Sequence, residues 1–292
     1  MLMARLSLLV ATLLFFQSAL AQVHTMATIR PLQFIASAVL LETDQVTGLG
    51  TAGHSHHHFE LLPSDRLAFE QADIVLWVGS SFEAELVEFV DQLRASGKQV
   101  VEALETPGLN LIEDPLTGLN PHIWLDPENA LVIATELVRV ASALNPQNTM
   151  RYEKNLESFE RNLDQAMAAA RSRLQAIKGD FAVYHDAFAY FEQQVQLQHG
   201  ASLLQPDAEQ PGIRRIIQVR QRLQELQPVC LLAEPDSDPA LIETFTRNLE
   251  DLPVISLDPL GQAISVSGSA YLEFIQSLVD GYTDCLVEFS SG

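Results

Sequence analysis

Six of the eight histidines in this chain fall in three short segments that are far apart in the sequence. The segments are GHSHHHFE with His54, His56, His57 and His58, NPHIWLDP with His122, and VYHDAFAYF with His185. Neutral imidazole suits zinc and its neighbours among the divalent metals, and ligands from different segments can leave one coordination position open. The pattern predicts a metal site that is assembled by folding and is suited to capture and release.

Each segment also has a simpler explanation. A lone histidine beside a strand or helix is more often a packed or capping residue, and the HSHHH run is equally consistent with a solvated loop that binds metal loosely. The formal net charge of -21 favours cations as ligands and argues against nucleic acid or an anionic membrane surface as a partner. The combination with the fold pattern described below favours the metal site.

Residues 1–21 have the features of a secretory signal peptide. Arg5 precedes an apolar run over residues 6–16, and Ala19-Leu20-Ala21 forms a small-residue cleavage site. The run is too short to span a bilayer and no comparable stretch follows, so we expect a soluble, exported chain in the periplasm.

The chain has two cysteines, Cys230 and Cys285. In an exported chain they most simply form one disulfide, with two buried thiols as the alternative.

The N-terminal half alternates short apolar strands with helices. Strands are expected at residues 27–30, 45–49, 74–78 and 99–103, and helices at residues 31–41 and 64–72, the second with Ser64 as its cap. The continuous apolar run IVLWV is typical of a strand that is buried on both faces of a parallel sheet. Asp126-Pro127-Glu128 predicts a further helix with a carboxylate cap, which Asn145-Pro146 ends.

A long helix follows from residue 146 to about 177, because its apolar positions step by three and four. Strands at residues 181–184, 229–232 and 254–257 then alternate with helices, the last of them over residues 269–286. The predicted fold class is α/β, with two lobes that each contain a mostly parallel sheet flanked by helices and are joined by a long spine helix. The expected divisions are residues 1–21 (signal peptide), 22–145 (N-terminal metal-binding lobe), 146–178 (linking helix) and 179–292 (C-terminal metal-binding lobe).

Three polar residues follow apolar strands of the C-terminal half almost directly: His185, Glu234 and Asp258. Ligands of open parallel sheets bind beyond the carboxyl ends of the strands, so these residues should point toward one crevice. The HSHHH loop and His122 would reach it from the N-terminal lobe. The site is therefore expected in a cleft between the two lobes.

Seven motifs together resemble, in order and spacing, the periplasmic zinc-binding proteins of ABC uptake systems, the ZnuA type of the cluster A-I metal-binding family. They are GHSHHHFELLPSD, ADIVLWVG, PHIWLDPE, YHDAFAYFE, QPGIRRI, LLAEPDSDP and SLDPLG. The resemblance covers nearly all of the chain after residue 21. It implies capture of Zn²⁺ in the periplasm and delivery to an ABC-type membrane permease, by a protein that is a monomer and not an enzyme. It also matches Cys230 and Cys285 to a cysteine pair that is bridged in some members.

By this resemblance three histidines hold the metal, namely His57, His122 and His185. His56 or His58 is the alternative to His57, because HHHFE replaces the usual PHDYE motif. Asp258 is a candidate fourth ligand, since the matching aspartate binds metal in manganese relatives. Those relatives carry glutamate where this chain has His185, so the histidine favours zinc. The alternative within the family is a protein for manganese or another divalent metal.

Two further features bear on the site. Many zinc members have a His-rich loop before the second ligand, whereas residues 106–121 contain no histidine, so His54 to His58 would have to gather metal instead. Asp186 and Glu60 are candidates for orienting an imidazole through its second nitrogen, although a cap or surface acid is the commoner role.

An exported zinc metallohydrolase is the alternative from another class of protein, with Glu234 as its general base. The absence of an HExxH motif argues against it.

Overall fold

The structure is a computed structural model of the 292-residue chain, and it describes residues 22–49, 61–114, 118–204, 211–247, 249 and 251–287. The predicted signal peptide at residues 1–21 lies outside the described residues, as do the HSHHH run and Glu60. Within the described ranges, no helix combines the length and apolar character needed to cross a membrane.

The N-terminal half is built around a four-stranded parallel sheet. Its strands, in the order β2-β1-β3-β4, are β2 (Gln45–Gly48), β1 (His24–Ala27), β3 (Ile74–Trp77) and β4 (Gln99–Glu102). Successive side chains of a strand point to opposite faces. Met26 and Val75 pack with Phe69 and Phe89 of two outer helices, and Ala27 and Leu76 pack into the central core. The outer helices are α2 (Pro63–Gln71) and α3 (Val87–Ala95).

The C-terminal half repeats this plan with a second parallel sheet. Its strands, in the order β10-β9-β7-β8, are β10 (Val254–Ser256), β9 (Leu231–Ala233), β7 (Ala182–His185) and β8 (Ala201–Leu204). Tyr184 and Leu231 face the outer helices, whereas Val183 and Leu232 face the central core. The outer helices are α7 (Ile213–Leu226) and α8 (Pro239–Thr246). Both sheets are thus covered on both faces, which explains their uninterrupted apolar strands.

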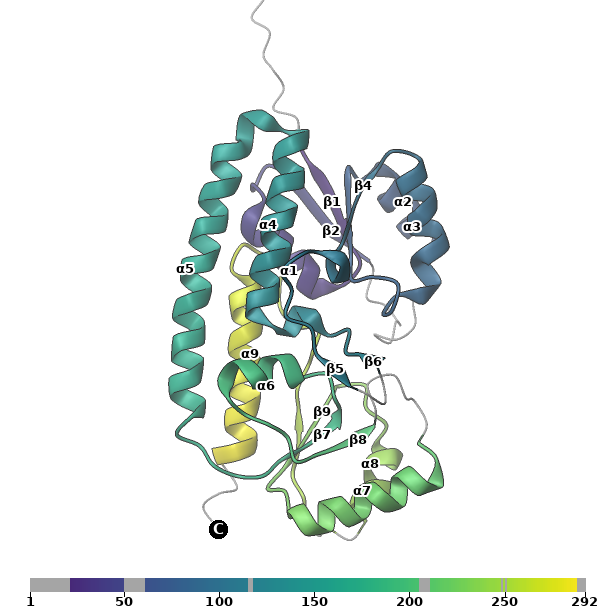
Figure 1. Cartoon of the computed structure of the whole chain (residues 1–292), viewed down its shortest axis with the longest axis vertical. Coiled ribbons are helices and arrows are strands. Elements are labelled where there is room, and N and C mark those ends of the chain that lie inside the picture. The colour runs from purple at the N-terminus through teal and green to yellow at the C-terminus, as the bar shows by residue number, and fades with distance from the viewer. Residues whose placement is uncertain are drawn as a thin grey trace, which may run out of the picture.

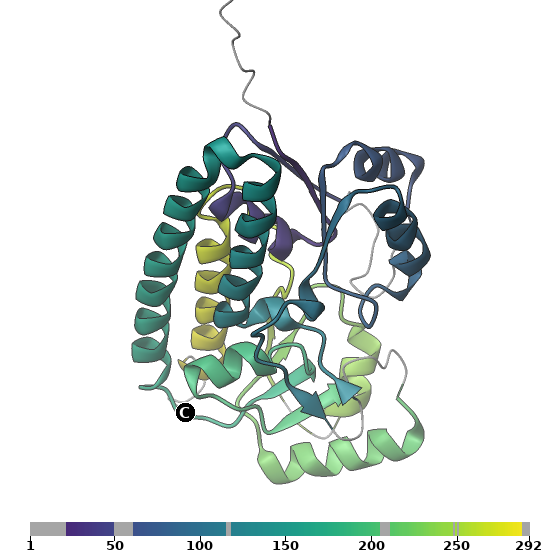
Figure 2. The ribbon, with the colours of Figure 1, turned by 45° about the horizontal axis from the view of Figure 1, so that its top comes forward.

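A layer of helices connects the two halves (Figures 1 and 2). It contains α1 (Arg30–Val39), α4 (Pro127–Leu144), α5 (Thr149–Leu174) and α9 (Ala270–Val287). The long helix α5 packs against α1 and α4 of the N-terminal half and against α9 and α6 (Ala189–Val195) of the C-terminal half. Phe159, Leu163 and Met167 form part of its buried stripe. The predicted spine helix is confirmed, and one apolar cluster includes side chains from both sheets.

A short connection leads from the first sheet to the helical layer. It contains the antiparallel pair β5 (Glu113–Asp114) and β6 (Gly118–Leu119) and a 3-10 turn over Ile123–Leu125. The predicted cap of the next helix is confirmed, because Asp126 Oδ1 accepts the backbone N–H of Glu128 at 2.9 Å and Pro127 begins α4. This cap fixes where α4 begins, five residues after His122.

Several predicted element limits were wrong by one to three residues, including those of the first strand, α2 and α5. The first strand is His24–Ala27, because Thr25 and Met26 pair with Ile74 and Val75, and Arg30 already begins α1. Ser64 does not cap α2. That helix begins at Pro63, and the carboxylate of Asp65 accepts the N–H of Leu62 at 2.9 Å. Pro146–Asn148 forms a separate 3-10 turn before α5.

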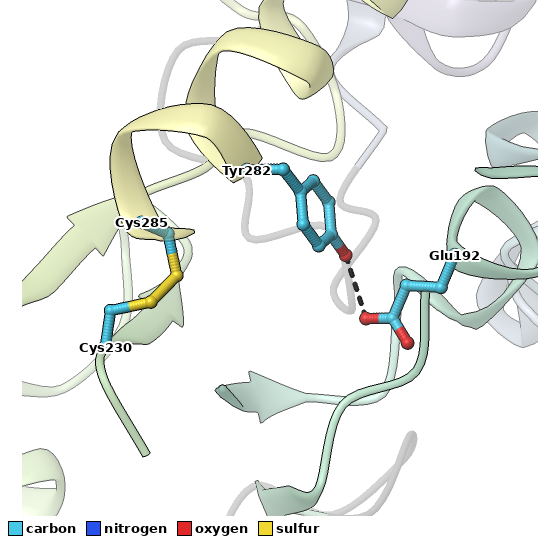
Figure 3. The surroundings of a disulfide bond; sticks show 4 residues. All are labelled: Glu192, Cys230, Tyr282 and Cys285. Atoms are coloured by element: carbon cyan, nitrogen blue, oxygen red, sulfur yellow. Dashed lines mark hydrogen bonds between the residues drawn. A yellow bond between two sulfur atoms is a disulfide. The ribbon is translucent and has the colours of Figure 1, made fainter. Parts of the chain in front are cut away.

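The cysteine pair forms a disulfide, Cys230–Cys285 (Figure 3). It joins the end of α9 to the residue just before β9. On another side of α9, the hydroxyl of Tyr282 donates to Glu192 Oε1 of α6 at 2.8 Å. The helix that also packs on α1 and α5 is therefore fixed to the second sheet by a covalent bond and to α6 by a buried hydrogen bond.

Candidate metal centre

His185 is placed by the register of the second sheet. It is the last residue of β7, and Glu234 directly follows β9, the neighbouring strand. Ala182 lies opposite Leu231 and Val183 lies opposite Leu232, so two residues further along His185 comes opposite Glu234. The imidazole Nδ1 of His185 is 2.7 Å from Glu234 Oε1, and both side chains are buried. The register therefore gives His185 a carboxylate partner at one ring nitrogen.

His122 is placed by Asn120, two residues earlier in the chain. The amide oxygen of Asn120 accepts the backbone N–H of His122 at 3.1 Å and lies 2.8 Å from its Nδ1. The amide nitrogen of Asn120 donates to the carbonyl of Asp186 at 2.8 Å, and the hydroxyl of Tyr190 donates to the carbonyl of Asn120 at 2.7 Å. Asn120 thus ties the His122 segment to the C-terminal half beside His185.

The two imidazoles face each other across the halves of the molecule. Nε2 of His122 is 3.3 Å from Nε2 of His185, and the ring centroids are 5.1 Å apart. Relative exposure is 0% for His122 and 4% for His185. Residues that are 63 positions apart in sequence are therefore brought together as two nitrogen donors in a buried position.

The partners at Nδ1 determine the chemistry of these rings. An amide oxygen and a carboxylate oxygen accept hydrogen bonds, so both contacts favour the neutral tautomer that carries its proton on Nδ1. In that tautomer the lone pair lies on Nε2, and the Nε2 atoms of the two rings are the ones that approach each other. This arrangement favours a cation bound between the rings, and oxygen partners of this kind are typical behind metal-binding histidines.

Aromatic side chains and a loop from the second sheet surround His122. The rings of Phe82 and Trp124 lie 5.9 Å and 5.1 Å from it. Trp124 Nε1 donates to the carbonyl of Pro259 at 2.8 Å, so the loop that carries Asp258 lies beside the His122 segment. The oxygens of Asp258 accept the N–H groups of Leu260 at 2.8 Å and Gln262 at 2.5 Å. These bonds hold the carboxylate within its own turn.

The other described histidines have different surroundings. His24 Nε2 is 3.0 Å from the hydroxyl of Thr47, and His199 Nδ1 is 2.8 Å from Glu192 Oε2. Across the part of the chain that the structure describes, no group of three or more His, Cys, Asp or Glu side chains could hold a metal ion. His122 and His185 are the predicted ligands that the described structure brings into contact.

A family model for the periplasmic component A of a zinc-uptake complex, ZnuA, matches residues 25–285. The chain belongs to this family. It is 31% identical over 295 residues to the high-affinity zinc uptake system protein ZnuA of Yersinia pestis, and the match covers 91% of this chain and 92% of that protein. The corresponding protein of Haemophilus ducreyi is 26% identical over 296 residues, with 92% and 94% of the two chains covered.

The fold of the family is also that of this chain. The structure is similar to that of the periplasmic zinc-binding protein TroA from Treponema pallidum, with a TM-score of 0.79 and 17% identity. The likeness covers 91% of this chain and 99% of that one. The predicted α/β architecture with two parallel sheets and a long connecting helix is therefore confirmed, and with it the resemblance on which the ligand assignment was based.

The predicted site residues have different outcomes. His122 and His185 lie in contact, while His54, His56, His57 and His58 are outside the described residues. The part played by Asn120 was not predicted, although an asparagine two residues before a histidine is a local signal for such a bond. Glu234 was placed correctly at the carboxyl end of its strand, but its contact with His185 depends on a register that the sequence pattern did not define.

Proposed function

We propose that this chain captures Zn²⁺ in the periplasm and delivers it to the membrane permease of an ABC importer. In this proposal His122 and His185 are two of the ligands. His57, or His56 or His58 in its place, is the third ligand, and Asp258 is the fourth. Residues 1–21 direct export, and the mature chain acts as a monomer.

The separation of the two Nε2 atoms is the observation that best supports zinc. Zinc–imidazole bonds are about 2.0 to 2.1 Å long, and structural zinc sites are tetrahedral. Two such bonds that meet at the tetrahedral angle separate their nitrogens by about 3.3 to 3.4 Å. The observed separation is 3.3 Å. The pair thus needs little rearrangement to bind the ion, which lowers the cost of capture.

The types of donor favour zinc over manganese. Imidazole suits zinc, whereas carboxylate and water suit manganese. At the end of β7 this chain has His185, and the nearby carboxylate of Glu234 contacts the Nδ1 side of that ring and not its Nε2 side. The buried part of the proposed site therefore offers two nitrogens to the ion.

The same contact argues against a hydrolase. A metal-bound water would need a general base within hydrogen-bonding reach, and Glu234 is the acid proposed for that role. Its Oε1 is 2.7 Å from His185 Nδ1, on the far side of the ring from the donor nitrogen. We infer that Glu234 orients a ligand, which agrees with membership of a transport family and not of an enzyme family.

Competitive zinc titration of the metal-stripped mature protein tests this proposal. The wild-type protein should bind about one equivalent of Zn²⁺ much more tightly than Mn²⁺. A His122→Ala, His185→Ala double variant should lose at least two orders of magnitude in zinc affinity, because two of four bonds to the metal are removed.

His24→Ala is the matched control. His24 contacts Thr47 on the first sheet and lies outside the proposed ligand set, so the variant should bind zinc like the wild-type protein. Equal zinc affinity of the double variant and the wild type would refute the assignment. Tighter binding of manganese than of zinc would refute the choice of metal.

A further inference from the structure

Helix α7 carries a positive charge that is unusual for this chain. Four of the 17 basic residues lie within its 14 residues, at Arg214, Arg215, Arg220 and Arg222, and Glu225 is its only acid. The chain as a whole has a formal net charge of -21. Helix α7 forms the outer edge of the C-terminal half, at the bottom of Figure 1, and Figure 2 shows the same arrangement.

One face of α7 is covered by the protein and another is exposed. Val219 and Leu223 are buried in the apolar cluster against the second sheet. On the outer side Ile213 and Ile217 are 77% and 60% exposed, and Arg220 continues the same stripe at helical spacing. Two neighbouring isoleucines with this exposure form a small apolar patch between arginines.

Among the residues that the structure describes, the arginines of α7 form no ion pair with an acid. Elsewhere in the structure Arg94, Arg139 and Arg173 form ion pairs with Asp91, Glu136 and Asp280 at 2.6 to 2.7 Å. In the described ranges no carboxylate lies within 4.0 Å of an α7 guanidinium. Arg215 and Arg222 donate instead to the carbonyls of Ser202 and Gly200, which keep the full positive charge.

These properties define the chemistry of a partner. Arginine is enriched at protein interfaces, where it binds carboxylates bidentately, and an apolar centre surrounded by charge is a common arrangement of binding surfaces. The surface formed by the exposed Ile213, Arg214 and Ile217 and the half-buried Arg220 would fit an apolar depression bordered by carboxylates. Complementary charge of this kind speeds association and sets the orientation of docking.

A membrane surface and a second copy of the chain fit the exposed face of α7 less well than a different protein partner does. Interfacial helices insert a broad apolar face into a membrane, whereas the apolar face of α7 is already buried and two isoleucines are exposed. The net charge of -21 also opposes an anionic lipid surface and a second copy of the chain. A protein partner that presents a local acidic surface is therefore favoured.

We propose that Ile213, Arg214, Ile217 and Arg220 form a docking surface for the membrane permease that receives the zinc, through carboxylates on its periplasmic side. This proposal rests on the proposed function, because it assumes that a permease takes the ion. It goes further in assigning the contact to one helix of the C-terminal half and in stating the charge that the permease must present.

The test is an Arg214→Glu, Arg220→Glu double variant of the full mature chain. Binding of the zinc-loaded protein to its own permease is measured in nanodiscs of neutral phosphatidylcholine, at low and high ionic strength. We expect binding at low salt to be weakened at least about tenfold, since two attractive contacts become repulsive, and to depend less on salt than in the wild type. An Ile213→Ser, Ile217→Ser variant should also bind the permease more weakly, without a change of charge.

A Lys154→Glu, Arg161→Glu variant is the matched control. Both residues are exposed on α5 and the change in charge is identical, so permease binding should stay within about twofold of the wild type. Equal weakening in this control would show that overall charge matters and not α7. Unchanged binding by the α7 variants, or no binding of wild type to the permease, would overturn the proposal.

Three further measurements separate the possible failures. Binding to anionic vesicles without permease, lost in the Arg214→Glu, Arg220→Glu variant, would identify a lipid surface and overturn the proposal. Self-association of the wild type that is lost in the same variant would show that α7 binds a second copy of the chain, and this result would also overturn the proposal. Zinc titration of all variants keeps the docking test independent: failure of the wild type to bind zinc refutes the proposed function, whereas normal zinc binding with unchanged docking refutes only the α7 surface.

Discussion

The orientation of each imidazole depends on a neighbour at its second nitrogen. Asn120 is 2.8 Å from Nδ1 of His122, and Glu234 is 2.7 Å from Nδ1 of His185. The types and spacing of the histidine segments were sufficient to identify His122 and His185 as candidates. Glu234 could not be assigned to His185 from sequence, because the contact spans two strands and depends on their register. The assignments of His57 and Asp258 as ligands stay predictions.

Replacement of Glu234 by glutamine should weaken zinc affinity by about 10- to 100-fold while the fold is retained, because the carboxylate that orients His185 is lost. Zinc titration and circular dichroism measure the two quantities. Glu225→Gln, an exposed change on α7, should leave affinity unaltered. An affinity of Glu234→Gln equal to that of wild type would mean that the contact does not help the site.

At the scale of elements, parallel strands and a capped helix position the candidate ligands. The apolar strands, the Asp126 cap and the long helix were predicted, since each depends on a local pattern of burial or capping. The start of the first strand was predicted three residues too late. Its position depends on pairing with Ile74 and Val75, and the pattern of the first strand alone contains no information on that pairing.

A buried acid after β3 predicts that the stability of the protein depends on pH. Glu83 Oε2 accepts the N–H groups of Val78 at 2.7 Å and Gly79 at 3.2 Å, and burial raises the pKa of Glu83 from 4.5 to about 7. The folded protein holds the proton of Glu83 more tightly than the unfolded chain does. The resulting contribution to stability is complete below pH 4.5 and is lost as the pH rises toward 7. The size of the loss is on the order of 3 kcal/mol.

Glu83→Gln should therefore flatten the fall in the unfolding free energy over this pH range, because the amide keeps an acceptor oxygen and does not ionise. Urea unfolding of the metal-free protein at several pH values provides the measurement. Glu88→Gln, an exposed change on α3, should reproduce the wild-type profile. A Glu83→Gln profile as steep as that of wild type would show that another group causes the dependence.

At the scale of the whole molecule, the two sheets share one apolar core through α1, α4, α5 and α9. The sequence predicted the two parallel sheets and the connecting helix, but the extent of this common core follows only from packing. The proposed division into lobes at residues 22–145 and 179–292 stays a prediction. The disulfide matters at this scale, because it fixes α9 to the second sheet and closes a loop of 55 residues.

Removal of the disulfide by Cys230→Ser, Cys285→Ser should lower the unfolding free energy by about 4 kcal/mol, from the chain entropy of a loop of this length. Denaturant unfolding of the variant, compared with the oxidised wild type, measures the loss. Zinc affinity should change little, because neither cysteine contacts His122 or His185. An unchanged unfolding free energy would show that packing of α9 already supplies the constraint.

The most direct test of the central claim is the position of zinc in a crystal of the zinc-loaded protein, measured by anomalous diffraction at the zinc edge. The account predicts one strong peak at about 2.0 to 2.1 Å from Nε2 of both His122 and His185. A principal peak bound to neither ring, for example at His24 or His199, would contradict it.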